Sequence, residues 1–158
     1  MKEIGFIGLG NMGISMAKNL IENGFNLTGF DLNPQQLDTL KELGGTPVAT
    51  CKEVGEKADA VFIMVLSGAQ IKQALFGDSG LLASLKPGST IIVSATVHPS
   101  EIRELEQPIL DRGIHLVDTP VSGGKPGAEG GTLTLMTAAP QQVFDDIKPV
   151  LQAVGKKI

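Results

Sequence analysis

Three glycines near the start of the chain have the spacing of a loop that binds a dinucleotide. Gly8, Gly10 and Gly13 follow the apolar run 4–7, and residues with helical spacing come after them. A strand, a glycine turn and a helix form the context in which G-x-G-x-x-G binds a pyrophosphate. Gly8 permits a sharp turn, Gly10 lets the backbone approach the phosphates, and Gly13 lets the helix pack closely on the sheet.

No Lys or Arg lies within this glycine loop. We therefore expect the phosphates to be held by free amides at the start of the following helix, where the helix dipole is equivalent to roughly half a positive charge. Taken alone, the pattern also fits a glycine-rich turn in another α/β protein. The stretch assigned to the cofactor comprises Gly8, Leu9, Gly10, Asn11, Met12 and Gly13.

An acidic residue follows the second predicted strand, 26–30. Asp31 stands 18 residues after Gly13, close to the spacing of about 20 expected for an acid that binds the ribose hydroxyls. A carboxylate there repels the 2′-phosphate of NADP, and no Arg occupies 32–36, so we expect NAD rather than NADP. Leu32 is assigned to the same site. Asp31 alternatively caps a turn, but Asn33 before Pro34 is the better helix cap and would leave Asp31 free for a ligand.

The composition describes a folded domain of ordinary size, residues 1–158, with 42% hydrophobic and 19% charged residues and a net charge of −4. Trp and Tyr are absent and no basic block occurs, which argues against nucleic acid as a partner. No apolar run approaches a membrane span, and we expect no membrane partner and no leader peptide. The single cysteine, Cys51, favours a reducing, cytoplasmic setting and is interpreted as a buried or capping residue.

Apolar and amphipathic segments alternate along the chain. This pattern predicts an α/β fold with a doubly wound, mostly parallel sheet of the Rossmann type and helices on both faces. Prolines are expected to break or bend the helix 98–112 at Pro108 and to kink the helix 140–154 at Pro149. After the first two strands, further strands are expected at 46–49, 60–66, 90–93, 114–117, 132–137 and from 156. Other helices are expected at 34–43, 51–57 and 70–76.

Ligands of such sheets bind at the carboxyl ends of the strands. The glycine loop, Asp31, Leu66 with Ser67, and Thr96 all follow predicted strands. Their common position predicts a single nucleotide cleft.

A glycine-rich segment, 118–131, is predicted to be a long loop after a strand. It begins DTPVSGGKPGAEGG and contains five glycines. Ser122, Gly123 and Gly124 offer a hydroxyl and two amides, which suit a carboxylate ligand. An ordinary mobile loop is the alternative.

Together, GLGNMG at the start and DTPVSGG…GAEGGTL later in the chain resemble the β-hydroxyacid dehydrogenases, the 3-hydroxyisobutyrate dehydrogenase family. That family includes tartronate semialdehyde, glyoxylate and succinic semialdehyde reductases and L-threonate dehydrogenases. The resemblance implies that Thr96 lies beside the nicotinamide, in a segment with Ser94 where Asp is common. It also implies that Val65, Leu66 and Ser67 line the adenosine side, and that Ser122, Gly123 and Gly124 hold the substrate carboxylate.

The resemblance implies that the catalytic lysine lies in a helical C-terminal domain, outside residues 1–158. We therefore assign no catalytic residue to 1–158 and expect the chain to be inactive alone, with a homo-oligomer for the full-length protein. Lys125 is not assigned as the base. His98 and His115 are interpreted as a turn residue and a strand residue, and no metal site is predicted.

The function predicted is NAD binding in an oxidoreductase that transfers a hydride between NAD and a small β-hydroxy acid or its semialdehyde. L-threonate dehydrogenase and tartronate semialdehyde or glyoxylate reductase are alternatives within the family. A non-catalytic NAD-sensing module is an alternative of another class. A methyltransferase is disfavoured by the G-x-x-G ending of the first loop.

Overall fold

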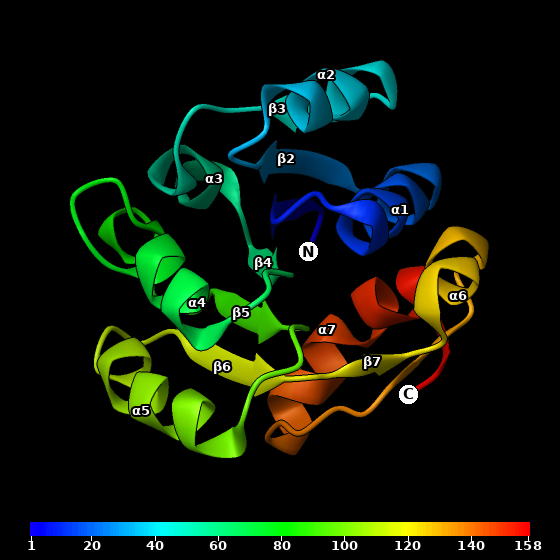
Figure 1. Ribbon diagram of the computed structural model, residues 1–158. Helices are drawn as coiled ribbons and strands as arrows, with labels where there is room; N and C mark the ends of the chain where they lie inside the picture. The colour runs from blue at the N-terminus through cyan, green and yellow to red at the C-terminus, as the bar shows by residue number, and fades with distance from the viewer.

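The computed structural model describes residues 1–158 and contains a six-stranded sheet in the order β3-β2-β1-β4-β5-β6 (Figure 1). Every neighbouring pair in this sheet is parallel. The doubly wound architecture predicted from the alternating segments is therefore confirmed. The strands are β1 (Glu3–Ile7), β2 (Asn26–Phe30), β3 (Thr46–Pro47), β4 (Ala60–Ile63), β5 (Thr90–Val93) and β6 (His115–Asp118).

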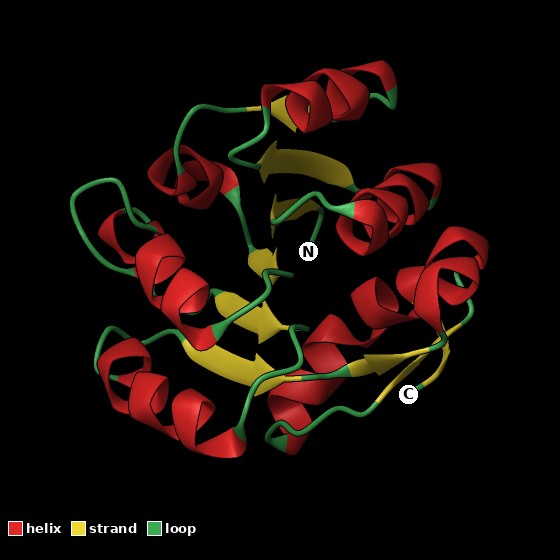
Figure 2. Ribbon diagram, in the orientation of Figure 1, coloured by secondary structure: helices red, strands yellow, loops and turns green.

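Helices cover both faces of the sheet (Figure 2). Successive strand residues point to opposite faces, so Phe62 and Ile92 join an apolar cluster with α1 and α7. Ile63 and Val93 join a second cluster with α3, α4 and α5. The helices are α1 (Asn11–Glu22), α2 (Pro34–Glu42), α3 (Cys51–Lys57), α4 (Gly68–Leu75), the 3₁₀ turn η1 (Leu81–Ala83), α5 (Pro99–Leu110), α6 (Gly124–Gly130) and α7 (Gln141–Val154). None of them combines the length and apolar composition needed to cross a membrane.

Helix starts follow the capping pattern of the sequence. The Asn33 side chain accepts a hydrogen bond from the amide of Gln35 at 3.0 Å, with Pro34 as the first residue of α2. His98 and Glu101 form a reciprocal capping box at the start of α5.

Of the two outcomes expected at Pro108, a break does not occur, because α5 continues to Leu110. Leu105 and Ile109, on either side of the proline, are buried against the sheet and hold the last turn in place. Helix α7 likewise remains helical past Pro149 to Val154.

The segment 118–131 is not a long loop, which corrects the sequence prediction. It contains β7 (Val121–Ser122) and the short helix α6, and it leads into β8 (Leu133–Leu135). These strands form a separate sheet, β7-β8-β9, whose β7–β8 pair is antiparallel and whose third strand is β9 (Gly155–Lys157). Gly127 and Ala128 are buried where α6 packs against α1. Because glycine has a low helix propensity, this packing is what stabilises α6 as a helix.

Candidate functional site

A cavity of about 380 Å³ opens at the carboxyl ends of β1, β2 and β4. The strand order reverses between β1 and β4, and this is the position where doubly wound sheets bind ligands. Six of the residues predicted for the cofactor line it: Gly8, Gly10, Asp31, Leu32, Val65 and Leu66. Seven lining residues were not predicted: Ile7, Phe30, Cys51, Met64, Gln70, Gln73 and Ala74.

The three glycines of the first loop occupy different surroundings. Gly8 has a φ of +95°, and a Cβ there would overlap the carbonyl of Met64. A Cβ on Gly13 would overlap the carbonyl of Gly8, which shows how closely α1 packs on the turn. A Cβ on Gly10 would meet no atom within 4 Å. Gly10 therefore borders open space in the cavity, whereas Gly8 and Gly13 are required by the fold.

Helix α1 begins at this open side. Its N-cap is Gly10, no side chain caps its first turn, and no acidic residue occupies that turn. The amides of a first helical turn have no partner within the helix and carry the positive end of the dipole. This end of α1 is therefore suited to an anion.

The Asp31 carboxylate lies beside the same loop. Its Oδ2 accepts a hydrogen bond from the amide of Leu9 at 2.7 Å, and its Oδ1 accepts one from the amide of Asn33 at 2.8 Å. Each oxygen of Asp31 thus already accepts a backbone hydrogen bond, and Asp31 joins the glycine loop to the end of β2, so only part of its acceptor capacity is left free. A carboxylate has about four acceptor positions, so two remain for a ligand.

Two leucines stand at the mouth of the cavity. The side chains of Leu32 and Leu66 are 85% and 89% exposed, and they come from the loops after β2 and β4. Gln70 orders the second loop, since its Oε1 accepts a hydrogen bond from the amide of Leu66 at 2.6 Å. Two exposed apolar side chains beside a cavity suit a flat, apolar ligand group.

Cys51 lines the cavity from the start of α3. Burial raises the pKa of its thiol to about 11, so the thiol is protonated at neutral pH. The geometry agrees with the interpretation of Cys51 as a buried residue and not a nucleophile.

The remaining predicted cofactor residues do not line the cavity. Ser67 caps α4 by accepting from the amide of Gln70 at 3.3 Å, and Thr96 is exposed beyond the end of β5. Near Thr96, the Oγ of Ser94 is a buried side-chain oxygen without a hydrogen-bond partner. Leu9, Asn11, Met12 and Gly13 lie within the loop and α1 but outside the lining.

The predicted carboxylate-binding residues lie outside the cavity, where β7 meets α6. Ser122, Gly123 and Gly124 are exposed, and the two glycines have φ values of +131° and +59°. These left-handed values are available to glycine at little cost. Burial raises the pKa of the Asp118 carboxyl, which lies at the end of β6 just before this segment.

Residues 3–158 match the family model described as the NAD binding domain of 6-phosphogluconate dehydrogenase. The chain belongs to this family. It is 37% identical over 157 residues to an L-threonate dehydrogenase of Cupriavidus necator, covering 99% of this chain and 53% of the relative. It is also 37% identical over 156 residues to a 2-hydroxy-3-oxopropionate reductase of Escherichia coli, with coverages of 99% and 53%.

A solved structure, the 3-hydroxyisobutyrate dehydrogenase of Salmonella typhimurium, superposes with a TM-score of 0.93 at 34% identity. It is matched over 99% of this chain and 55% of its own. The chain thus spans about half the length of the relatives that it matches.

The residues of the cavity fit the cofactor of the family. Gly10 leaves the space that a pyrophosphate needs, the first turn of α1 is uncapped, and Asp31 retains acceptor positions. Domains of this family bind NAD through the same kind of strand–glycine–helix unit, so the match and the geometry agree.

Proposed function

We propose that this chain provides the cofactor site of an NAD-dependent β-hydroxyacid dehydrogenase. The observation that carries the proposal is the cavity at the strand-order reversal, where the open side of Gly10 and the uncapped start of α1 lie beside Asp31. Bound NAD accepts or returns a hydride at its nicotinamide ring. The residues of this chain bind the dinucleotide and orient it.

Each part of the cofactor has a counterpart in the cleft. The amides at the start of α1 would hold the pyrophosphate, and Asp31 would accept hydrogen bonds from the adenosine ribose. Leu32 and Leu66 would cover the two faces of the adenine, with Val65 and Ser67 on the same side. Thr96, at the carboxyl end of β5, would lie beside the nicotinamide.

The substrate we propose is a small β-hydroxy acid or the matching semialdehyde. Ser122, Gly123 and Gly124 would hold its carboxylate through a hydroxyl and two amides. The resemblance assigns proton transfer to a lysine of a helical domain outside residues 1–158, so we expect this chain alone to bind NADH without turnover. We further propose that the whole protein is a homo-oligomer of the cytoplasm, where the single cysteine of residues 1–158 stays reduced.

Two relatives favour related substrates. The L-threonate dehydrogenase and the 2-hydroxy-3-oxopropionate reductase are equally identical to this chain. L-threonate and tartronate semialdehyde therefore belong beside 3-hydroxyisobutyrate in an activity panel. If the whole protein turned over none of these three compounds, the result would favour a non-catalytic NAD-sensing domain.

The choice of cofactor is tested by Asp31→Asn. The unmodified chain should bind NADH more tightly than NADPH, because the Asp31 charge repels a 2′-phosphate. The asparagine should narrow that difference about tenfold, since a few kcal/mol is the upper limit for one charge pair at an exposed site. Fluorescence titration of both nucleotides measures the difference.

The control is Asp38→Asn, which removes the same charge from an exposed position on α2. It should leave the ratio of the two affinities unchanged. Equal affinities for NADH and NADPH in the unmodified chain, or no binding of either, would contradict the proposal.

A further inference from the structure

A buried hydrogen bond joins helix α1, which begins at the glycine loop, to helix α6. The Nδ2 of Asn19 on α1 donates to the carbonyl of Ala128 on α6 at 2.6 Å. Asn19 is 8% exposed and Ala128 is fully buried, although 109 positions separate them in the chain. The polar amide of Asn19 is thus buried within a contact that is otherwise apolar.

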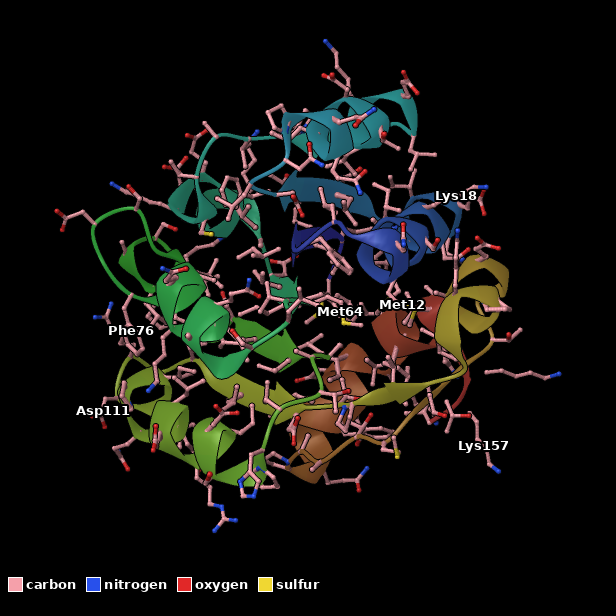
Figure 3. The ribbon with its side chains drawn as sticks, in the orientation of Figure 1. Met12, Lys18, Met64, Phe76, Asp111 and Lys157 are labelled. Atoms are coloured by element: carbon pink, nitrogen blue, oxygen red, sulfur yellow. The ribbon has the colours of Figure 1, made fainter.

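The surroundings of this bond are apolar. Met16, Leu20, Ala128 and Leu133 belong to a single buried cluster. The two helices lie side by side in Figure 1, and Figure 3 labels Lys18, the exposed neighbour of Asn19, on the outer side of α1. Apolar contacts are not directional, so they leave α6 free to shift along α1. A hydrogen bond requires a defined distance and angle, and Asn19 supplies that constraint.

The carbonyl of Ala128 lies near the end of α6, where carbonyl groups lack partners within the helix. The amide of Gly131 approaches it only to 3.4 Å. Gly131, with a φ of +64°, turns the chain toward β8, and a Cβ there would lie 3.5 Å from the Asn19 Nδ2. Asn19 therefore bonds to the last turn of α6 and lies beside the turn that follows it.

Helix α6 cannot hold its own orientation. It has seven residues, three of them glycine, and so little intrinsic helical preference. Its first turn continues directly from the Ser122–Gly124 segment, because the amide of Gly127 donates to the carbonyl of Gly123 at 3.1 Å. A displacement of α6 along α1 would carry this segment with it.

We infer that Asn19 is a positioning residue that fixes Ser122, Gly123 and Gly124 relative to the dinucleotide loop at the other end of α1. The inference rests on the proposed function, in which those three residues hold the substrate carboxylate. A small acid then meets the nicotinamide at a distance set by one rigid helix. Asn19 itself touches neither ligand.

The test uses Asn19→Leu, which has a similar size and no donor, and Asn19→Gln, which keeps an amide. In the protein at its natural full length, Asn19→Leu should raise the KM for the hydroxy acid about tenfold and leave the KM for NAD within about twofold. Asn19→Gln should lie closer to the unmodified protein. Asn19→Ser, too short to reach the carbonyl, replaces the leucine variant if that variant does not fold.

The matched control is Leu20→Ala, which removes a buried side chain from the same helix and keeps the hydrogen bond. It should lower stability and leave both KM values unchanged. Equal increases in both KM values for Asn19→Leu, or no increase, would overturn the inference.

Hydrogen exchange separates this inference from the proposed function. In Asn19→Leu, the amides of Gly127, Gly131 and Thr132 should exchange at least about tenfold faster, while NADH affinity stays within about twofold. Unchanged exchange overturns the positioning role whether or not any hydroxy acid is oxidised. If the unmodified protein oxidised no hydroxy acid but amide exchange was still faster in Asn19→Leu, the proposed substrate would be refuted and the positioning role of Asn19 would stand.

Discussion

Gly10 and Gly13 belong to one motif, but their surroundings give them different roles. A Cβ on Gly13 would overlap the carbonyl of Gly8, whereas a Cβ on Gly10 would enter open space beside the cavity. Gly10 also has a φ of −67°, which any residue adopts. Nothing in the fold itself therefore requires glycine at Gly10, and we propose that the bound dinucleotide is what requires it.

Alanine at the two positions should separate binding from stability. Gly10→Ala should unfold at the same temperature as the unmodified chain and bind NADH at least about tenfold more weakly, because its methyl group occupies the space of the pyrophosphate. Gly13→Ala should lose on the order of 1–3 kcal/mol of stability, the usual cost of overpacking. Thermal unfolding and NADH titration measure the two effects. A fully binding Gly10→Ala protein would refute the placement of the pyrophosphate.

At the scale of the elements, α5 contains two prolines in unlike positions. Pro99 is the first helical residue, where the missing amide has no partner to lose. Pro108 lies inside the same helix, where the amide of another residue would donate to the carbonyl one turn earlier. Burial of Leu105 and Ile109 compensates for that missing bond.

Pro108→Ala should therefore stabilise the chain by about 1 kcal/mol, since the restored hydrogen bond outweighs the greater freedom of the unfolded alanine chain. Pro99→Ala is the matched control and should be neutral or slightly destabilising. Urea denaturation at equilibrium measures both free energies of unfolding. Equal effects of the two substitutions would contradict this account of α5.

At the scale of the whole molecule, the cleft is formed by segments that lie far apart in the chain. The loops after β1, β2 and β4 meet where the strand order reverses, and the Leu9–Asp31 hydrogen bond joins two of them. A dinucleotide contacting all three loops binds the folded state alone.

Such binding should stabilise the entire fold. At an NADH concentration of 100 times its Kd, linkage predicts about 2.7 kcal/mol, which corresponds to a rise in Tm of roughly 5–10 °C for a chain of this size. Differential scanning calorimetry measures the shift. The Gly10→Ala protein at the same NADH concentration should show a much smaller one, and an equal shift in both proteins would point to binding elsewhere.

Local patterns were sufficient for the main sheet and for half of the cleft. Glycine spacing located the turn after β1, Asp31 followed β2 as expected, and the cap at Asn33 began its helix. These features depend on neighbours within a few residues, so they can be predicted from the sequence. Lining residues such as Phe30, Met64 and Gln73 were not predicted, because apolar and amide side chains do not by themselves indicate a ligand site, and only the tertiary structure brings these three to one cavity.

The amino-acid sequence by itself determined the alternation of strands and helices and the position of the glycine loop after β1, because backbone conformation there follows from glycine, proline and apolar spacing. Only the tertiary structure decided that the segment 118–131 holds a helix and that β7, β8 and β9 form a second sheet. It also decided that Asp31 is bonded to Leu9 and that Asn19 reaches Ala128. These outcomes depend on contacts between residues far apart in the chain, and a buried partner can overrule the weak preference of a glycine-rich segment.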